Sequence, residues 1–263
     1  RYPGGFVCGN CGGRECWTTA REYLHCARCG AQVSLRSGTL FQGSKKPLSL
    51  WFRGLYLFVS LKSGITARDL RSQLGLSSYQ TAWAWLARIR EGARTASCAT
   101  LSGTVEIDQL FYPQPGGGDP VAIAVAVERG ARNRIGSVRM EPLKELSSSA
   151  MNRFLRDTTA AGSLIHCDGW NLLSDPDYRY DVSEKRDPEE LLPSVRLAAG
   201  QFRQRLSRSH PGPVDRRQIG RYIGEFQFRF NFRKERNSGV LFDSLLSGMV
   251  TEGPRTFGDL TGV

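Results

Sequence analysis

The sequence has no hydrophobic run long enough to cross a membrane. A spanning helix needs roughly 20 consecutive apolar residues, and the longest candidate, LSLWFRGLYLFVSLKSGI over 48–65, is interrupted by Arg53 and Lys62. A buried helix explains this segment better, and we expect no membrane partner. A signal-peptide pattern is also missing, and the chain begins at Arg1 rather than Met, which indicates a fragment or a trimmed chain.

Acidic residues are too few to balance the basic ones. The 263 residues include 36 Lys plus Arg against 25 Asp plus Glu, which gives a net charge of +11 and a pI near 9.6. Such a field attracts polyanions, of which nucleic acid is the commonest. A basic protein without such a partner is the alternative. The hydrophobic content of 40% is ordinary for a globular protein and argues against wholesale disorder.

The cysteines are too few and too unevenly paired for a disulfide framework. Seven is an odd number, and four of them form two CxxC pairs: Cys8 with Cys11, and Cys26 with Cys29. This favours metal binding in a reducing compartment. With Gly12, Gly13 and Gly30 at positions that need positive φ, two such turns predict a four-thiolate structural Zn²⁺ site. An iron–sulfur site is the alternative.

Residues 47–92 have a helical pattern. Pro47 starts one predicted helix, which Gly64 ends, and Thr66 caps a second helix that turns at Gly75. Ser77 or Ser78 then caps a third helix, with apolar residues on one face. Two short helices joined by LGLSS are typical of a helix-turn-helix, and an ordinary helical hairpin is the alternative. We expect the last helix to present these residues to DNA: Ser78, Tyr79, Gln80 and Arg88.

Two aspartates stand at the ends of predicted strands. TVEIDQLFY, VAIAVAVE and NRIGSVRM predict an antiparallel meander, followed by an amphipathic helix and the short apolar run SLIHCDGW. Asp108 ends the first of these strands and Asp168 ends the fourth. Each can be a solvated strand end, but two carboxylates on neighbouring strands can also hold divalent cations for phosphoryl transfer. Strand–strand–strand–helix–strand with acids on the first and fourth strands is the ribonuclease H-like arrangement.

Taken together, these segments resemble the bacterial insertion-sequence transposases that carry a zinc ribbon before a DDE domain, the ISXO-like group. The matching pieces follow the family's order: RYPGGFVCGNCGG, YLHCARCG, SGTLFQGSKKPLSLWF, GTVEIDQLFY, HCDGW and RYIGEFQFRFNFR. The resemblance implies an α/β fold with a ribonuclease H-like core, a mixed sheet with flanking helices. It also implies DNA strand transfer with Mg²⁺ or Mn²⁺, and it places Asp108 and Asp168 at the family's first two catalytic aspartates.

The third catalytic position departs from the family. Relatives have Glu, Asn or His about two helical turns before a Lys, and the matching stretch here is EELLPSVRLAAGQFRQRLSRSH. If Arg203 stands in the lysine position, the ligand position falls at Arg196, which cannot bind a cation. Glu189, Glu190 and Glu225 are the available substitutes. Either the third ligand has moved or the site is impaired.

Arginines and aromatics alternate in the final third of the chain. Basic and aromatic side chains together suit contact with phosphates and bases, although packing explains most of the phenylalanines. The predicted nucleic-acid contacts in this region are Arg203, Arg205, Arg229 and Arg233. The segment 251–263 is predicted to be a flexible tail.

These patterns predict a zinc ribbon over 1–40, a helix-turn-helix region over 41–97 and a DDE-type catalytic domain over 98–250. The leading hypothesis is a DNA transposase that binds double-stranded transposon ends and target as a homodimer or higher oligomer, in the bacterial cytoplasm at the nucleoid. A catalytically impaired, transposase-derived DNA-binding protein is the second hypothesis. A nuclease with the same core but no strand transfer is the third.

Overall fold

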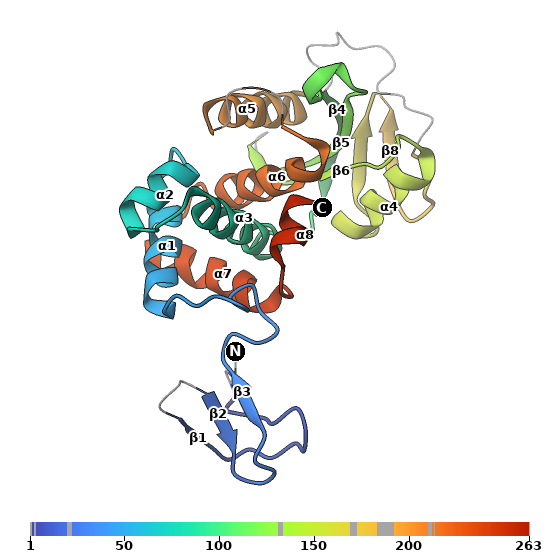
Figure 1. Cartoon of the computed structure of the whole chain (residues 1–263). Coiled ribbons are helices and arrows are strands. Elements are labelled where there is room, and N and C mark those ends of the chain that lie inside the picture. Colours follow the sequence, from blue (N-terminus) through green and yellow to red (C-terminus); the bar gives the residue numbers. More distant parts are fainter. Residues whose placement is uncertain are drawn as a thin grey trace.

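The computed structural model describes residues 2–262 apart from 3, 20–22, 131–133, 169–172, 183–191, 210–211 and 213. This described part contains a small three-stranded ribbon, a group of helices and a five-stranded mixed sheet flanked by helices (Figure 1). No helix within it has both the length and the apolar character that a bilayer crossing requires.

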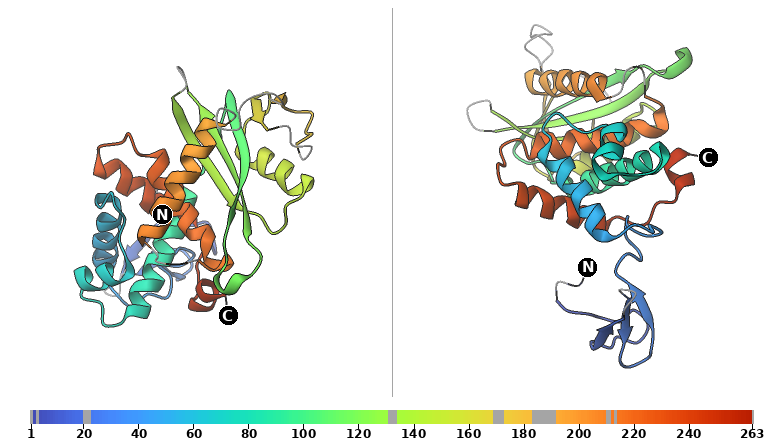
Figure 2. Two further views of the ribbon diagram at one scale, coloured as in Figure 1. Left: turned by 90° about the horizontal axis from the view of Figure 1, so that it is seen from above. Right: turned by 60° about the vertical axis from the view of Figure 1, so that its left-hand side comes forward.

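The N-terminal ribbon stands apart from the other elements (Figures 1 and 2). Strands β1 (Cys16–Thr18), β2 (Tyr23–Cys26) and β3 (Gln32–Ser34) form an antiparallel sheet in the order β1-β2-β3. Its buried cluster consists of Phe6, Cys8 and Cys26. So small a core cannot stabilise a fold unaided, which is why the cysteine ligands matter here.

The next three helices begin where the sequence predicts. Helix α1 (Leu48–Ser60) follows Pro47, and α2 (Ala67–Leu74) has a capping box between Thr66 and Asp69. Gly75 turns the chain at φ 62°, and the Ser78 hydroxyl accepts from the Thr81 backbone N–H to cap α3 (Tyr79–Ala96). Helix α1 stops at Ser60, before Gly64, whose φ is 97°.

The helices of the predicted helix-turn-helix region share their core with the C-terminus. Helix α7 (Ser238–Thr251), expected within the catalytic domain, contributes Leu245 and Met249 to the core of α1–α3. It crosses α3 closely at Gly248, because a Cβ there would lie 2.0 Å from the Gly92 carbonyl oxygen. The helical region is therefore completed by residues far along the chain.

The sheet confirms the predicted order of strands and helix. Strands β4 (Thr104–Tyr112), β5 (Val121–Arg129) and β6 (Ile135–Pro142) form the antiparallel meander, with the 3-10 turn η1 (Pro115–Gly117) between the first two. Helix α4 (Ser148–Thr158) leads to β7 (Leu164–Cys167), and β8 (Arg179–Val182) follows. The strand order is β6-β5-β4-β7-β8, and β7 runs parallel to both β4 and β8.

The two faces of the sheet have separate cores. Helix α4 packs with Val105 and Ile107 on one face, while α5 (Pro193–Ser209) and α6 (Arg216–Asn231) pack with Leu110 and Tyr112 on the other. Even-numbered residues of β4 therefore face α5 and α6, because side chains alternate along a strand.

Helix α6 separates the sheet core from the helical core. Phe226 and Phe230, four residues apart, pack toward the sheet, whereas Phe228 and Phe232 pack with α1–α3 and α7. Packing thus accounts for all four phenylalanines, on opposite sides of one helix.

Polar side chains from the end of α6 cover the edge strand β6. The Gln227 side-chain oxygen accepts from the Met140 backbone N–H at 2.8 Å, and Asn231 bonds both the N–H and the carbonyl of Val138 at 2.8 and 3.1 Å. This edge of the sheet is closed to strand pairing with a second chain.

Part of the C-terminal segment differs from the predicted flexible tail. Residues 257–261 form α8 (Phe257–Thr261), capped by Thr256. Leu260 is buried, and its carbonyl accepts from Arg221 Nη1 at 2.6 Å and from Gln218 Nε2 at 2.9 Å. The burial of Leu260 and the two hydrogen bonds from α6 thus hold α8 in place. Both hydrogen-bond donors lie about 40 residues earlier in the sequence.

Candidate functional site

The four CxxC cysteines meet at one point. The Sγ atoms of Cys8 and Cys29 are 3.7 Å apart, those of Cys11 and Cys26 are 3.6 Å apart, and all four lie within 4.8 Å of one another. A tetrahedral zinc with bonds of about 2.3 Å places its sulfurs about 3.8 Å apart. The cluster therefore fits a four-thiolate zinc ribbon, as predicted.

Matching turns aim the two cysteine pairs. The Gly12 N–H donates to the Cys8 carbonyl and the Gly30 N–H to the Cys26 carbonyl, with φ of 69° and 70°. Gly13 differs from the prediction, because it lacks positive φ. A steric restriction explains the glycine at this position instead, since a Cβ there would lie only 3.2 Å from Cys26 Sγ.

Hydrogen bonds to sulfur favour a thiolate at Cys29 but not at Cys11. At Cys11 the lowering effect of the Gly13 N–H is outweighed by the combined effect of Cys29, burial and the other two thiols, which raises the pKa to about 12. The Asn10 amide donates to Cys29 Sγ at 3.5 Å, and with the Ala31 N–H it lowers the pKa of Cys29 to about 6. Thiolates are the metal-binding form of cysteine.

The two predicted catalytic aspartates lie side by side on the face of the sheet that α5 covers. Strands β4 and β7 are parallel, with Glu106 opposite His166. Asp108 lies in the middle of β4, whereas the sequence predicted it at the end of that strand. Asp168 directly follows β7, so continued alternation along the two strands directs both side chains to this face. Burial of the carboxyl, with the neighbouring Asp168 carboxylate, raises the pKa of Asp108 to about 6, against the lowering effects of the Gln109 N–H and Arg196. Asp168 itself is exposed.

A buried carboxylate that sequence reasoning missed fixes the helix above this pair. Glu106 is fully buried and lies two residues before Asp108 on the same face. Its Oε2 accepts from the backbone N–H groups of Ser194 and Val195 at 2.7 and 3.1 Å, and its Oε1 accepts from Ser194 Oγ at 2.9 Å. Arg129 Nε lies 3.4 Å from the same Oε1. Glu106 thereby anchors the first turn of α5 to β4.

Arg196 follows this anchored turn directly. Its guanidinium is close enough to lower the pKa of Asp108, although burial of that carboxyl outweighs it. The family resemblance places the third ligand at position 196, and the arginine at that position brings a positive charge to the aspartate pair instead. A positive charge there opposes the binding of a divalent cation.

Of the three candidate substitutes for the third metal ligand, Glu225 has other partners. Glu225 is buried between Arg90, at 2.7 Å from its Oε2, and Arg229, at 2.9 Å from its Oε1. Both of its oxygens are thus used where α3 meets α6, so Glu225 is not available as the substitute ligand. Glu189 and Glu190 lie outside the described residues.

The predicted DNA-reading residues of α3 divide into two groups. Tyr79 and Gln80 are exposed in the first turn and Ser78 caps it, so this turn is accessible. Arg88 instead donates to the carbonyls of Gln42, at 3.3 Å, and Arg255, at 2.7 Å. Arg88 therefore links the loop that contains Gln42 to the one that contains Arg255.

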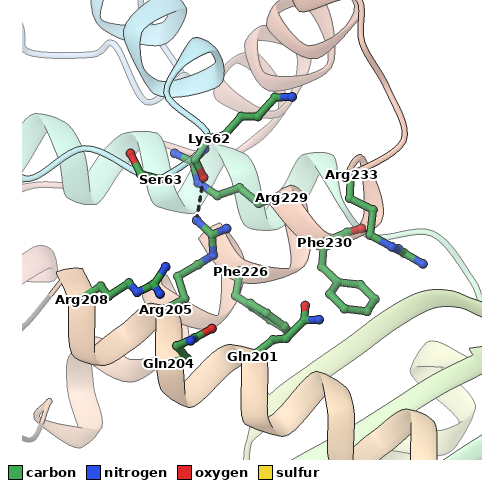
Figure 3. Close-up of a pocket in the computed structure, with 10 residues that line it drawn as sticks. All are labelled: Lys62, Ser63, Gln201, Gln204, Arg205, Arg208, Phe226, Arg229, Phe230 and Arg233. Carbon is green, nitrogen blue, oxygen red and sulfur yellow. Dashed lines mark hydrogen bonds between the residues drawn. The ribbon is translucent and has the colours of Figure 1, made fainter.

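The predicted basic contacts of the final third also separate. Arg203 is exposed on α5, while Arg205, Arg229 and Arg233 line a pocket between α5, α6 and the loop after α1 (Figure 3). The Arg229 Nη atoms donate to the carbonyls of Leu61 and Phe58, each at 2.9 Å. These contacts fix its guanidinium within the described chain.

Comparison with known proteins gives little at the level of sequence. No family model and no curated protein matches this chain. Among solved structures, the chain is similar to one in a cryo-EM structure of the simian T-cell lymphotropic virus intasome in complex with PP2A regulatory subunit B56 gamma. The two share 11% identity over 70% of this chain and 69% of that chain, with a TM-score of 0.36. At that score the likeness establishes neither a shared fold nor a shared function.

Proposed function

We propose that this protein is a DNA transposase whose Asp108 and Asp168 bind divalent cations for strand cleavage and strand transfer at insertion-sequence ends. The observation that carries the proposal is the nearness of the two carboxyls, since Asp168 helps to raise the pKa of Asp108 where the parallel strands β4 and β7 lie side by side. The strand order β6-β5-β4-β7-β8, with an antiparallel meander and a parallel extension, supports a ribonuclease H-like core.

The chain's own residues would prepare this site. Asp108 and Asp168 supply oxygen ligands of the kind that Mg²⁺ and Mn²⁺ prefer, and Glu106 holds α5 beside them. When bound, such cations activate the nucleophile and stabilise the leaving oxygen, so no covalent enzyme intermediate is needed. Zinc at the four cysteines would fold the ribbon without taking part in the reaction.

The partners follow from charge and from the resemblance to insertion-sequence transposases. A net charge of +11 and the exposed first turn of α3 support contact with double-stranded DNA. Assembly as a dimer or higher oligomer at the bacterial nucleoid completes the proposal.

The test is a strand-transfer assay in Mg²⁺ or Mn²⁺ on a labelled duplex that carries the terminal sequence of the element encoding the chain. Joined products are expected with the native protein and with Asp119→Ala, a change at an exposed aspartate outside the site, and not with Asp108→Ala. Tight binding of the same DNA without cleavage or joining would refute the enzyme. Cleavage without joining would identify a nuclease.

A second candidate is a catalytically impaired protein that still binds DNA. The observation in its favour is Arg196, whose charge acts on Asp108 where a third ligand is expected. DNA binding without any strand cleavage in either metal, together with intact folding, is the result that this candidate predicts.

A further inference from the structure

A basic groove runs between the loop after α1 and the C-terminal ends of α5 and α6 (Figure 3). It joins two adjacent cavities of about 390 and 580 Å³, which share four lining residues, Lys62, Arg205, Arg229 and Arg233. The cations of this basic groove are Lys62, Arg205, Arg208, Arg229, Arg233 and Arg236. Glu235 is the acid among the residues that line it.

The fixed cations of the basic groove form its inner wall. Arg229 is held by Glu225 and by two backbone carbonyls. Arg233 lies over the Phe230 ring, 4.3 Å from its centroid, and donates to the Gly136 carbonyl at 3.0 Å. Arg205 reaches across the groove to donate to the Lys62 carbonyl at 3.1 Å. These bonds hold positive groups in place before any ligand arrives.

The remaining cations have no partner within the described chain. The side chains of Lys62, Arg208 and Arg236 are exposed, and none of the described residues accepts a hydrogen bond from them or pairs with them. Burial, followed by the neighbouring Arg229 and Arg208, lowers the pKa of Arg205. Six cations thus gather where Glu225 and Glu235 are the nearby acids, so positive charge remains in excess and an anion would relieve the repulsion.

The chemistry of the basic groove favours phosphates over bases. Three of its phenylalanines, Phe226, Phe228 and Phe230, are at most 5% exposed. The fourth, Phe232, is half-buried and packs on Phe228 with ring centroids 4.9 Å apart, so packing covers the ring faces that could stack on bases. Cavities of this size admit one sugar–phosphate chain. A double helix, whose major groove alone is about 12 Å wide, is too broad to enter.

The basic groove lies away from the aspartate pair. Arg196 and Arg205 are nine residues apart on α5, which separates them by about 14 Å and half a turn around the helix. The phosphates bound beside Arg205 are therefore not the ones presented to Asp108 and Asp168.

We infer that the basic groove binds the sugar–phosphate backbone of a single nucleic-acid strand, without reading its sequence and away from the reacting phosphate. The inference rests on the proposed function only in assigning that strand to DNA. It adds Lys62, Arg208 and Arg236 to the residues that contact the substrate.

The test compares Lys62→Gln/Arg208→Gln with Lys144→Gln/Arg153→Gln in the zinc-loaded full chain. Both pairs remove one lysine and one arginine from exposed positions, and the control pair lies on the opposite side of the sheet, near α4. Fluorescence anisotropy would follow binding of a labelled 20-nucleotide single strand, as DNA and as RNA, and of a 20-base-pair duplex, from 50 to 200 mM salt.

The groove variant should bind the single strand about 10-fold or more weakly near 100 mM salt. Its slope of log affinity against log salt should fall by about 1.4, since each single-strand phosphate contact contributes about 0.7. The control variant should match the native protein. Equal effects of the two variants, or a loss confined to the duplex, would overturn the inference.

Two further readouts separate this inference from the proposed function. Asp108→Ala should retain native single-strand affinity, and the groove variant should retain native Mn²⁺ binding in calorimetry. Equal loss with DNA and RNA supports backbone recognition, whereas retained RNA binding would overturn the claim that the backbone alone is read. Circular dichroism and thermal unfolding confirm folding, and Lys62→Gln alone provides a milder variant.

Discussion

Replacing Arg196 by glutamate would exchange the cation beside the aspartate pair for a third carboxylate. Arg196 directly follows Ser194 and Val195, which Glu106 binds, so the new side chain would start from an anchored backbone. We expect Arg196→Glu to strengthen the binding of Mn²⁺ to the Asp108–Asp168 site.

The magnitude follows from Coulomb's law. Two unit charges about 5 Å apart in water contribute about 0.8 kcal/mol. The substitution changes the local charge by two units opposite a divalent ion, which amounts to about 3 kcal/mol, or on the order of 100-fold in the dissociation constant.

The assay is calorimetric titration of the zinc-loaded protein with Mn²⁺, with Arg203→Glu as the matched control. Arg203 is exposed and lies seven residues further along α5, about 10 Å away. Screening over that distance should limit its effect to about twofold. Equal changes in the two variants would refute the placement of Arg196 beside the metal ligands. Strand transfer by Arg196→Glu but not by the native chain would identify Arg196 as the cause of impairment.

Three other predictions concern the same residues and the ribbon. Without divalent cations, Asp108→Asn should stabilise the protein by about 1–2 kcal/mol at pH 7.5 but little at pH 4. The pKa of Asp108 is about 6 in the folded protein and 3.8 in the unfolded chain, so ionisation of this carboxyl at high pH favours unfolding, and asparagine removes that effect. Urea unfolding at both pH values checks this, and lower stability of the variant at pH 7.5 would contradict it. Glu106→Ala should destabilise the protein by about 3 kcal/mol or more, since it leaves the buried N–H groups of Ser194 and Val195 without their acceptor. Amide hydrogen exchange at Ser194 and Val195 should accelerate, and unchanged exchange would disprove the anchoring role. Zinc content should be one per chain and should fall in Cys29→Ser but not in Cys98→Ser, a change at an exposed cysteine outside the cluster. A chelator should unfold the ribbon, which ends with β3 at Ser34, and leave Leu40 packed in the helical core. A ribbon that stays folded without metal would exclude a structural zinc.

Local patterns predicted the features that depend on neighbours in sequence. The caps at Thr66 and Ser78, the turn at Gly75 and the two cysteine pairs each involve groups a few residues apart, so the sequence displays them directly. The order of strands around Asp108 was also predicted, since alternation and turn residues mark each strand.

Contacts between distant segments could not be predicted in the same way. Glu106 lies on the same face of β4 as Asp108 because the two residues are two apart along the strand. Its hydrogen-bond partners, however, are on α5, 88 residues later in the sequence. Glu225 looks like any acid on a helix, and its two arginine partners become visible only when α3 and α6 pack together. The phenylalanines of α6 similarly serve two cores because the helix lies between them.

The position of α6 and α7 has a consequence for how the chain folds as it is synthesised. The four clustered cysteines of the ribbon all lie between Cys8 and Cys29, so with zinc bound it could fold soon after it leaves the ribosome. Helices α1–α3 are made next, yet their core lacks Phe228, Leu245 and Met249 until nearly the whole chain has emerged. A ribosome-bound chain stopped within α5 should therefore carry a folded ribbon and a loose, protease-sensitive helical segment. The later arrival of α6 and α7 should bring the helices and the sheet to their native packing together.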